Sequence, residues 1–80
     1  MYDPKLETLV HSKYLFERAE AVKQGYGLDV LINDPEPCIR LLIAEQGYGL
    51  DILVHDNDFV VRQSVAEQGY GLDILINDPN

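Results

Sequence analysis

The sequence predicts an all-α fold, an α-solenoid in which a unit of 22 residues is stacked about three and a half times. The first observation is repetition, because QGYGLDVLIN at 24–33 returns as QGYGLDILVH at 46–55 and as QGYGLDILIN at 68–77. The second is helical spacing, since Leu28, Leu31 and Ile32 stand at positions i, i+3 and i+4 and share one helix face. Together they predict one domain over residues 1–80, with units at about 3–24, 25–46 and 47–68 and a half-unit at 69–80.

Each unit is expected to begin with a short helix. The apolar run near residues 28–32 and its counterpart at 50–54 span about five to seven residues, a length that leaves α-helix and 3₁₀-helix open. A first copy without the GYG segment places Leu6 in the same column as Leu28, Leu50 and Leu72.

A longer α-helix is expected to complete each unit, roughly over 13–24, 37–46 and 59–68. Asp34-Pro35 and Asp56-Asn57 are typical of helix starts. Glycine follows each long helix, at positions 25, 47 and 69, where a left-handed residue ends a helix. One pair of helices cannot bury both apolar faces, so identical neighbours are expected to stack into a superhelix, with the right-handed form expected.

The two ends of the predicted stack differ. Glu17 and Glu20 stand where the next unit has Ile39 and Leu42, which predicts a polar outer face on the first unit. The final half-unit has a neighbour on one side only. Its apolar residues are therefore candidates for self-association into a two-fold homodimer, and these are Leu72, Leu75 and Ile76.

Composition excludes several classes of function. Six Lys and Arg against fourteen Asp and Glu give a net charge of -8, which argues against nucleic acid and against an anionic membrane surface. No apolar stretch approaches the roughly 18 residues of a membrane span, and the N-terminus does not read as a signal peptide. Cys38 is the only cysteine, which excludes an internal disulfide and a cysteine metal cluster. We expect a cytoplasmic protein.

Polar columns recur with the same period. Arg18, Arg40 and Arg62 are expected to pair with Asp34 and Asp56 along the stack as a structural ladder, because a planar guanidinium suits repeated bidentate pairing with carboxylates. Binding of an anion is the alternative.

Tyrosines form another column. Tyr26, Tyr48 and Tyr70 either pack over the neighbouring unit or form an exposed strip that binds a partner, since tyrosine is enriched at interface hot spots.

The spacing of the arginines also carries a resemblance to known families. The run of Asp34, Ile39-Arg40 and Ile43-Ala44, repeated 22 residues later, resembles the second helix of HEAT repeats, whose units contain about 40 residues. It is more similar to the leucine-rich repeat variant family, whose shorter units carry a DP…VR…VA run and alternate α- with 3₁₀-helices. The resemblance covers about residues 6–80, although QGYG is a general feature of neither family. It implies a helical stack. The activity of the best-known variant-repeat protein is not implied, because this chain lacks the cysteines of its iron–sulfur cluster domain.

Chemistry-bearing motifs are weak. QGYG follows a helix and lacks the GK[ST] ending of a phosphate loop, and Asp56-Asn57-Asp58 lacks the glycine and glutamate of a calcium loop. His11 and His55 stand two units apart, too far to share a metal. Cys38 aligns with Phe16 and Val60 and is expected in the core.

No catalytic, metal or cofactor residues are therefore predicted. We expect a non-catalytic module that binds an unidentified protein or peptide. A self-assembling structural module that dimerises through the C-terminal half-unit is the alternative.

Overall fold

The computed structural model describes residues 2–71, and within this range the chain forms six helices and no strand. The all-α class predicted from the sequence is confirmed. Short and long helices alternate along the chain. The short ones are α1 (Pro4–Val10), α3 (Leu28–Leu31) and α5 (Leu50–Leu53), and the long ones are α2 (Leu15–Lys23), α4 (Pro37–Glu45) and α6 (Phe59–Glu67).

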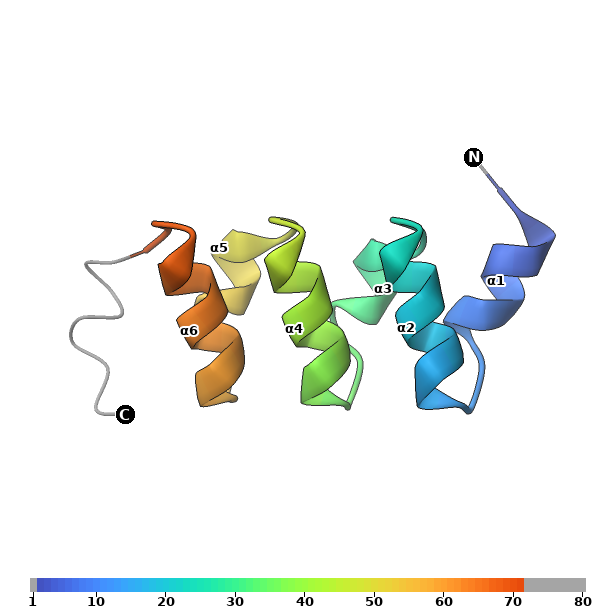
Figure 1. The fold of residues 1–80 in the computed structure, drawn as a ribbon, viewed down its shortest axis with the longest axis horizontal. Helices are drawn as coiled ribbons and strands as arrows, with labels where there is room; N and C mark the ends of the chain where they lie inside the picture. Colours follow the sequence, from blue (N-terminus) through green and yellow to red (C-terminus); the bar gives the residue numbers. More distant parts are fainter. Residues whose placement is uncertain (1, 72–80) are drawn as a thin grey trace.

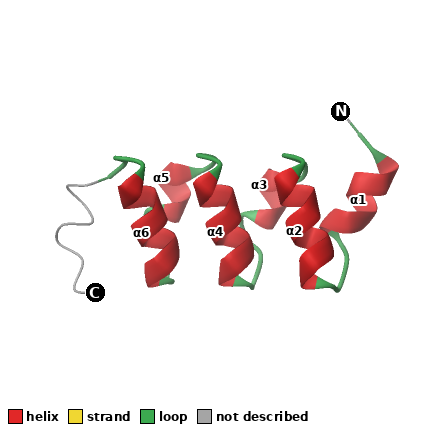
Figure 2. Ribbon diagram, in the orientation of Figure 1, coloured by secondary structure: helices red, strands yellow, loops and turns green. Residues whose placement is uncertain are grey.

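The long helices form a row, and α4 contacts both α2 and α6 (Figure 1). Helices α3 and α5 lie behind this row, and each contacts the long helix before it and the long helix after it. The loops that follow the long helices lie along one edge of the row, and the loops that lead into the long helices lie along the opposite edge (Figure 2). The resulting body measures 42 × 22 × 14 Å along its principal axes.

The first glycine of each GYG segment ends a long helix, as predicted. After α2, the N–H of Gly25 donates to Val22 O at 2.8 Å and the N–H of Tyr26 donates to Ala21 O at 3.0 Å. This pair of bonds is the Schellman motif, which requires a left-handed residue, and Gly25 has φ 71°. The same two bonds follow α4 and α6.

The second glycine has a tertiary role that the sequence analysis did not identify. Gly27 and Gly49 precede the short helices α3 and α5, and Gly71 stands in the same column of the repeat; each of the three has a positive φ. A Cβ atom on Gly49 would lie 2.2 Å from Cδ1 of Ile32, the residue that ends the preceding short helix. Only glycine therefore lets one unit approach the core of the unit before it.

The first long helix begins later than predicted, whereas α4 and α6 begin at the predicted residues 37 and 59. Helix α2 starts at Leu15 instead of residue 13, because Ser12 Oγ accepts the N–H of Tyr14 at 3.0 Å and holds the preceding residues in a turn. In the next unit Asp34 Oδ1 accepts the N–H of Glu36, which makes Glu36 the N-cap of α4. The aspartates read as helix starts therefore build the turn that precedes the helix.

The short helices α3 and α5 are α-helical and contain four residues each, fewer than predicted. Helix α1 is longer, with seven residues. Its start differs because its N-cap is Asp3, two positions earlier in the unit than the glycine that caps α3 and α5. Asp3 Oδ1 accepts the N–H groups of Lys5 and Leu6 at 3.0 and 3.1 Å. Pro4 occupies the first turn, where its missing N–H costs nothing.

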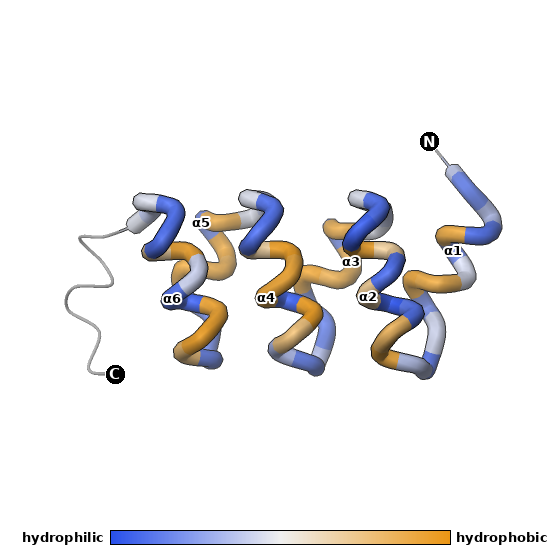
Figure 3. Tube along the Cα trace, viewed as in Figure 1, coloured by the Kyte–Doolittle hydropathy of each residue, from blue (hydrophilic) through white to orange (hydrophobic). Residues whose placement is uncertain are grey.

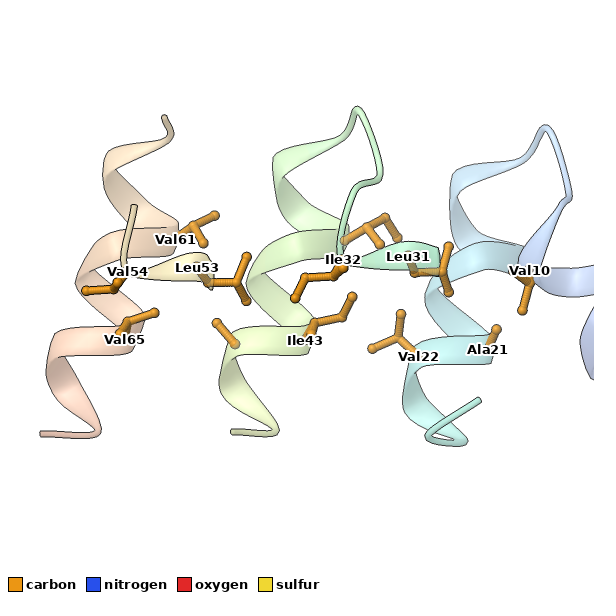
Figure 4. Packing of buried hydrophobic residues seen from close by; sticks show 12 residues of the cluster. Val10, Ala21, Val22, Leu31, Ile32, Ile43, Leu53, Val54, Val61 and Val65 are labelled. Carbon is orange, nitrogen blue, oxygen red and sulfur yellow. The ribbon is translucent and has the colours of Figure 1, made fainter. Parts of the chain in front are cut away.

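The core lies between the row of long helices and the short helices, and it repeats with the unit (Figure 4). One column is contributed by the short helices and the residues that end them, and it consists of Val10, Ile32 and Val54. A second column is contributed by the long helices and consists of Ala21, Ile43 and Val65. All six side chains are at most 5 % exposed, so neighbouring units stabilise one another by burying apolar surface.

The glutamine of QGYG connects the ends of adjacent long helices. Gln46 Nε2 donates to Val22 O in the last turn of α2 at 2.6 Å, and Gln68 Nε2 donates in the same way to Ala44 O in the last turn of α4. The C-terminal carbonyls of a helix lack intrahelical donors, so each glutamine helps to satisfy the helix end of the preceding unit. Gln24 instead bonds to Glu20 on its own helix.

Replacing Gln46 with alanine is expected to lower the free energy of unfolding by about 1 kcal/mol, the usual net value of one hydrogen bond. Gln24→Ala is the matched control, because the bond of Gln24 to Glu20 is exposed and joins no second unit. Urea denaturation followed by far-UV circular dichroism measures both. Equal losses for the two variants would contradict the inter-unit role of Gln46.

Candidate interaction surfaces

The arginine and aspartate columns form ion pairs between units. Arg18 binds Asp34 through Nε at 2.7 Å and Nη2 at 3.3 Å, and Arg40 binds Asp56 through the same atoms at 2.7 and 3.1 Å. The four side chains are 4–14 % exposed. Their guanidinium groups are therefore engaged in bidentate pairs, which favours the structural ladder over the binding of an anion.

Each arginine also binds the loop of its own unit. Arg40 Nη1 donates to Asp34 O at 2.6 Å, and Arg62 Nη1 donates to Asp56 O at the same distance. The hydrogen bond that Arg40 donates to the Asp56 carboxylate raises the pKa of Arg40, as does the negative charge of that carboxylate, against the effect of desolvation. The loops before α4 and α6 are thus held between two arginines.

The tyrosine column divides into two environments. The Tyr26 hydroxyl accepts the N–H of Asp3 at 3.1 Å and donates to Glu7 Oε1 at 3.0 Å, so Tyr26 joins α1 to the turn after α2. Tyr48 and Tyr70 are each 40 % exposed. Asp29 occupies the column of Glu7 in the next unit, and its side chain is one methylene shorter. The tyrosines therefore combine the two alternatives, with packing at Tyr26 and exposure at Tyr48 and Tyr70.

The charge around Tyr26 is negative. The hydrogen bond from the Asp3 N–H lowers the pKa of Tyr26, but desolvation together with the hydrogen bond and charge of Glu7 raises it above its ordinary value. His11 Nε2 lies 2.9 Å from Glu7 Oε2 on the outer side of the same carboxylate. Glu7 is therefore the centre of a small polar network on the first unit.

An open cavity of about 510 Å³ adjoins this network. Tyr2, Tyr26 and the carboxylates of Glu7 and Asp29 provide its polar and aromatic lining, with Val10 and Val30 as apolar lining. Its volume lies within the range of about 300–1,000 Å³ found for ligand sites. Of the tyrosine column, Tyr26 is the residue that lines this cavity.

A second surface was not predicted from the sequence. It is formed by apolar side chains on the first turns of the long helices, and we call it the long-helix strip. The tube is hydrophobic over the first turns of α2 and α6 (Figure 3). The strip consists of Leu15, Phe16, Cys38, Phe59 and Val60, all exposed. Phe16 is 71 % and Val60 52 % exposed.

The prediction that Cys38 lies in the core was wrong, because its side chain is exposed. The buried positions of α4 are Ile39, Ile43 and Ala44, which define the inner face at i, i+4 and i+5. Position 38 precedes that face by one residue, or about 100° around the helix, and so points outward. If the apolar residues of the long helix had been assigned to helix faces with this spacing, Cys38 would have been placed on the outer face.

A groove of about 220 Å³ lies within the long-helix strip, between the starts of α4 and α6. Cys38, Leu41 and Val60 provide its apolar lining, and Asp58 adds a carboxylate. The groove is small enough to accept a side chain and too small for a whole peptide.

Other predicted sites are located as follows. Leu72, Leu75 and Ile76, the residues assigned to self-association, lie outside the described residues. Among residues 2–71, no three His, Cys, Asp or Glu side chains are grouped so that they could hold a metal ion. None of the helices in that range combines the length and apolar character that crossing a membrane requires.

The chain was also compared with known proteins. No protein-family model, no curated protein and no solved structure matches it.

Proposed function

We propose that this chain is a right-handed α-solenoid of the leucine-rich repeat variant or HEAT-like type, and that it acts as a non-catalytic module that binds a segment of another protein. The alternation of short and long helices with a 22-residue period supports the architecture. The recurring arginines and the aspartates that follow the short helices are used in contacts between units, as in the Arg18–Asp34 and Arg40–Asp56 pairs. The engagement of these charged groups in pairs supports binding as the proposed function of the surface.

The observation that carries the proposal is the long-helix strip. Side chains that are exposed and apolar in two columns of the long helices contribute nothing to the core, and exposed apolar surface that recurs on neighbouring helices is typical of an interaction site. In the column of Phe16 the next units place Cys38 and Val60, and in the column of Leu15 they place Pro37 and Phe59. The strip therefore extends over three units, the length of a short bound segment.

The charge of the molecule indicates the chemistry of the partner. The net charge is -8, and Glu36 and Asp58 stand at the N-caps of α4 and α6, directly before the residues of the strip. A partner segment that combines aromatic or aliphatic anchors with lysine or arginine would complement both features. One of its apolar anchors would occupy the groove between Cys38 and Val60.

The proposal is tested by selecting peptides from a random display library on the full chain. We expect enrichment of sequences that carry apolar anchors beside basic residues. We expect Val60→Ser to weaken the selected peptides by about tenfold, since an anchor contact contributes roughly 1–2 kcal/mol.

Ile52→Ser is the matched control, because Ile52 is 55 % exposed on α5 and Val60 is 52 % exposed on α6. Peptides that lose affinity equally for both variants, or that are acidic, would contradict the proposal. Light scattering over a range of concentrations accompanies the selection. A dimer that dissociates on Val60→Ser would show that a second copy covers the strip, and this would also overturn the proposal.

A further inference from the structure

The cavity beside Tyr26 differs from the rest of the repeat in two of its lining residues. Tyr2 stands in the column that holds Gln24, Gln46 and Gln68, and Glu7 stands in the column that holds Asp29 and Asp51. Both departures contribute to the same cavity, where they add an aromatic ring and a longer carboxylate. The first unit therefore has a combination of groups that the consensus of the repeat does not provide.

The lining is suited to a cation with an apolar stem. Rings of Tyr2 and Tyr26 attract a cation through their negatively charged faces. Carboxylates of Glu7 and Asp29 supply formal negative charge, and Val10 and Val30 offer apolar surface. The raised pKa of Tyr26, caused in part by the charge of Glu7, is consistent with a negative potential at this position.

We propose that this cavity is a binding site for an arginine side chain, separate from the long-helix strip. A guanidinium stacks on aromatic rings and forms a planar fork with a carboxylate, whereas an ammonium group does neither as well. Asp29 is the carboxylate available for the fork, because it is exposed at the start of α3. Both Glu7 oxygens already lie in hydrogen bonds, to Tyr26 and to His11, so Glu7 contributes charge. The arginine stem packs on Val30, which is 49 % exposed.

The site is tested with N-acetyl-arginine amide as the probe, titrated into the isotope-labelled full chain and followed by NMR. We expect chemical-shift changes centred on the amides of Tyr2, Gly25, Gly27 and Asp29. The dissociation constant should lie in the millimolar range for a single side chain, which corresponds to a binding free energy of about −4 kcal/mol. N-acetyl-citrulline amide has the same shape without the charge and should produce no saturable shift. N-acetyl-lysine amide should bind more weakly than the arginine probe.

Asp29→Asn should weaken binding of the arginine probe by about tenfold, because it removes a charge-assisted hydrogen-bond partner. Asp51→Asn is the matched control, since Asp51 is the equivalent exposed residue of the next unit. If both variants lost the same affinity for the arginine probe, the loss would reflect net charge alone, and the proposed site would be overturned. Equal binding of citrulline, or of lysine, would overturn the assignment to arginine. None of these outcomes depends on Val60, so the failure of this site and the failure of the long-helix strip are distinguishable.

Discussion

Gly49→Ala is expected to lower the free energy of unfolding by about 3 kcal/mol, from a left-handed backbone penalty of roughly 1–2 kcal/mol and an overpacking cost of similar size. The φ of Gly49 is 64°, and an added Cβ would lie 2.2 Å from Ile32 Cδ1. Ile32 is 5 % exposed in the core, so it cannot move aside without opening the contact between units. Urea denaturation followed by far-UV circular dichroism measures the loss.

Gly47→Ala is the control for the backbone term. Gly47 has φ 80°, and its added Cβ would meet only Gln68 Oε1 at 3.5 Å, an ordinary contact. We therefore expect Gly47→Ala to lower the free energy of unfolding by about 1 kcal/mol. The prediction for Gly49 fails if the two variants lose the same stability, because the loss at Gly49 would then contain no contribution from packing.

Arg40→Ala is expected to cost about 3 kcal/mol, because removing one partner of a buried ion pair leaves the other charge uncompensated. Arg40 and Asp56 are 12 % and 7 % exposed, and the guanidinium also binds Asp34 O and Asn57 Oδ1. Losing it releases both the loop before α4 and the loop before α6. The same denaturation experiment measures the loss.

Two comparisons isolate the pair. Arg40→Lys keeps the charge without the planar fork and should give an intermediate loss. A double-mutant cycle with Asp56→Ala should show the two single losses to be strongly non-additive, since the residues share one interaction. A cost of Arg40→Ala below about 1 kcal/mol, as is typical of exposed pairs, would contradict the ladder as a stabilising element.

Much of the fold could be predicted because the repeat carries the same local signals several times. The helix stop at Gly25 follows from the left-handed conformation that a Schellman motif requires, and this requirement involves only neighbouring residues. The pairing of Arg18 with Asp34 was assigned from the period, and the structure places these two residues in a bidentate ion pair. The start of α2 was predicted less well, because Ser12 and residue 13 are also compatible with a helix until the Ser12 side chain binds the N–H of Tyr14.

The interaction surfaces were harder to predict. Cys38 was assigned to the core because Phe16 and Val60 are apolar, but burial depends on which side of a long helix faces the short helices. The cavity at Tyr26 was also not predicted, because Tyr2 and Glu7 resemble ordinary departures of a terminal unit in the sequence. Tyr26 and Tyr48 occupy one column of the repeat, yet their environments differ. Tyr26 hydrogen-bonds to Glu7 in α1, whereas Tyr48 is 40 % exposed.

The sequence by itself determined the helical class, the 22-residue period, the order of short and long helices and the glycine that ends each long helix. These features depend on spacing and backbone conformation within one unit, where residues close in the chain decide the outcome. Only the tertiary structure decided why the second glycine of the GYG segment is required, which carbonyl groups accept the hydrogen bonds of the glutamines, and which apolar columns stay exposed outside the core. Each of these features depends on distances between units, such as that from Gly49 to Ile32. Periodicity determines which residues are equivalent, but it does not determine how closely neighbouring units approach one another.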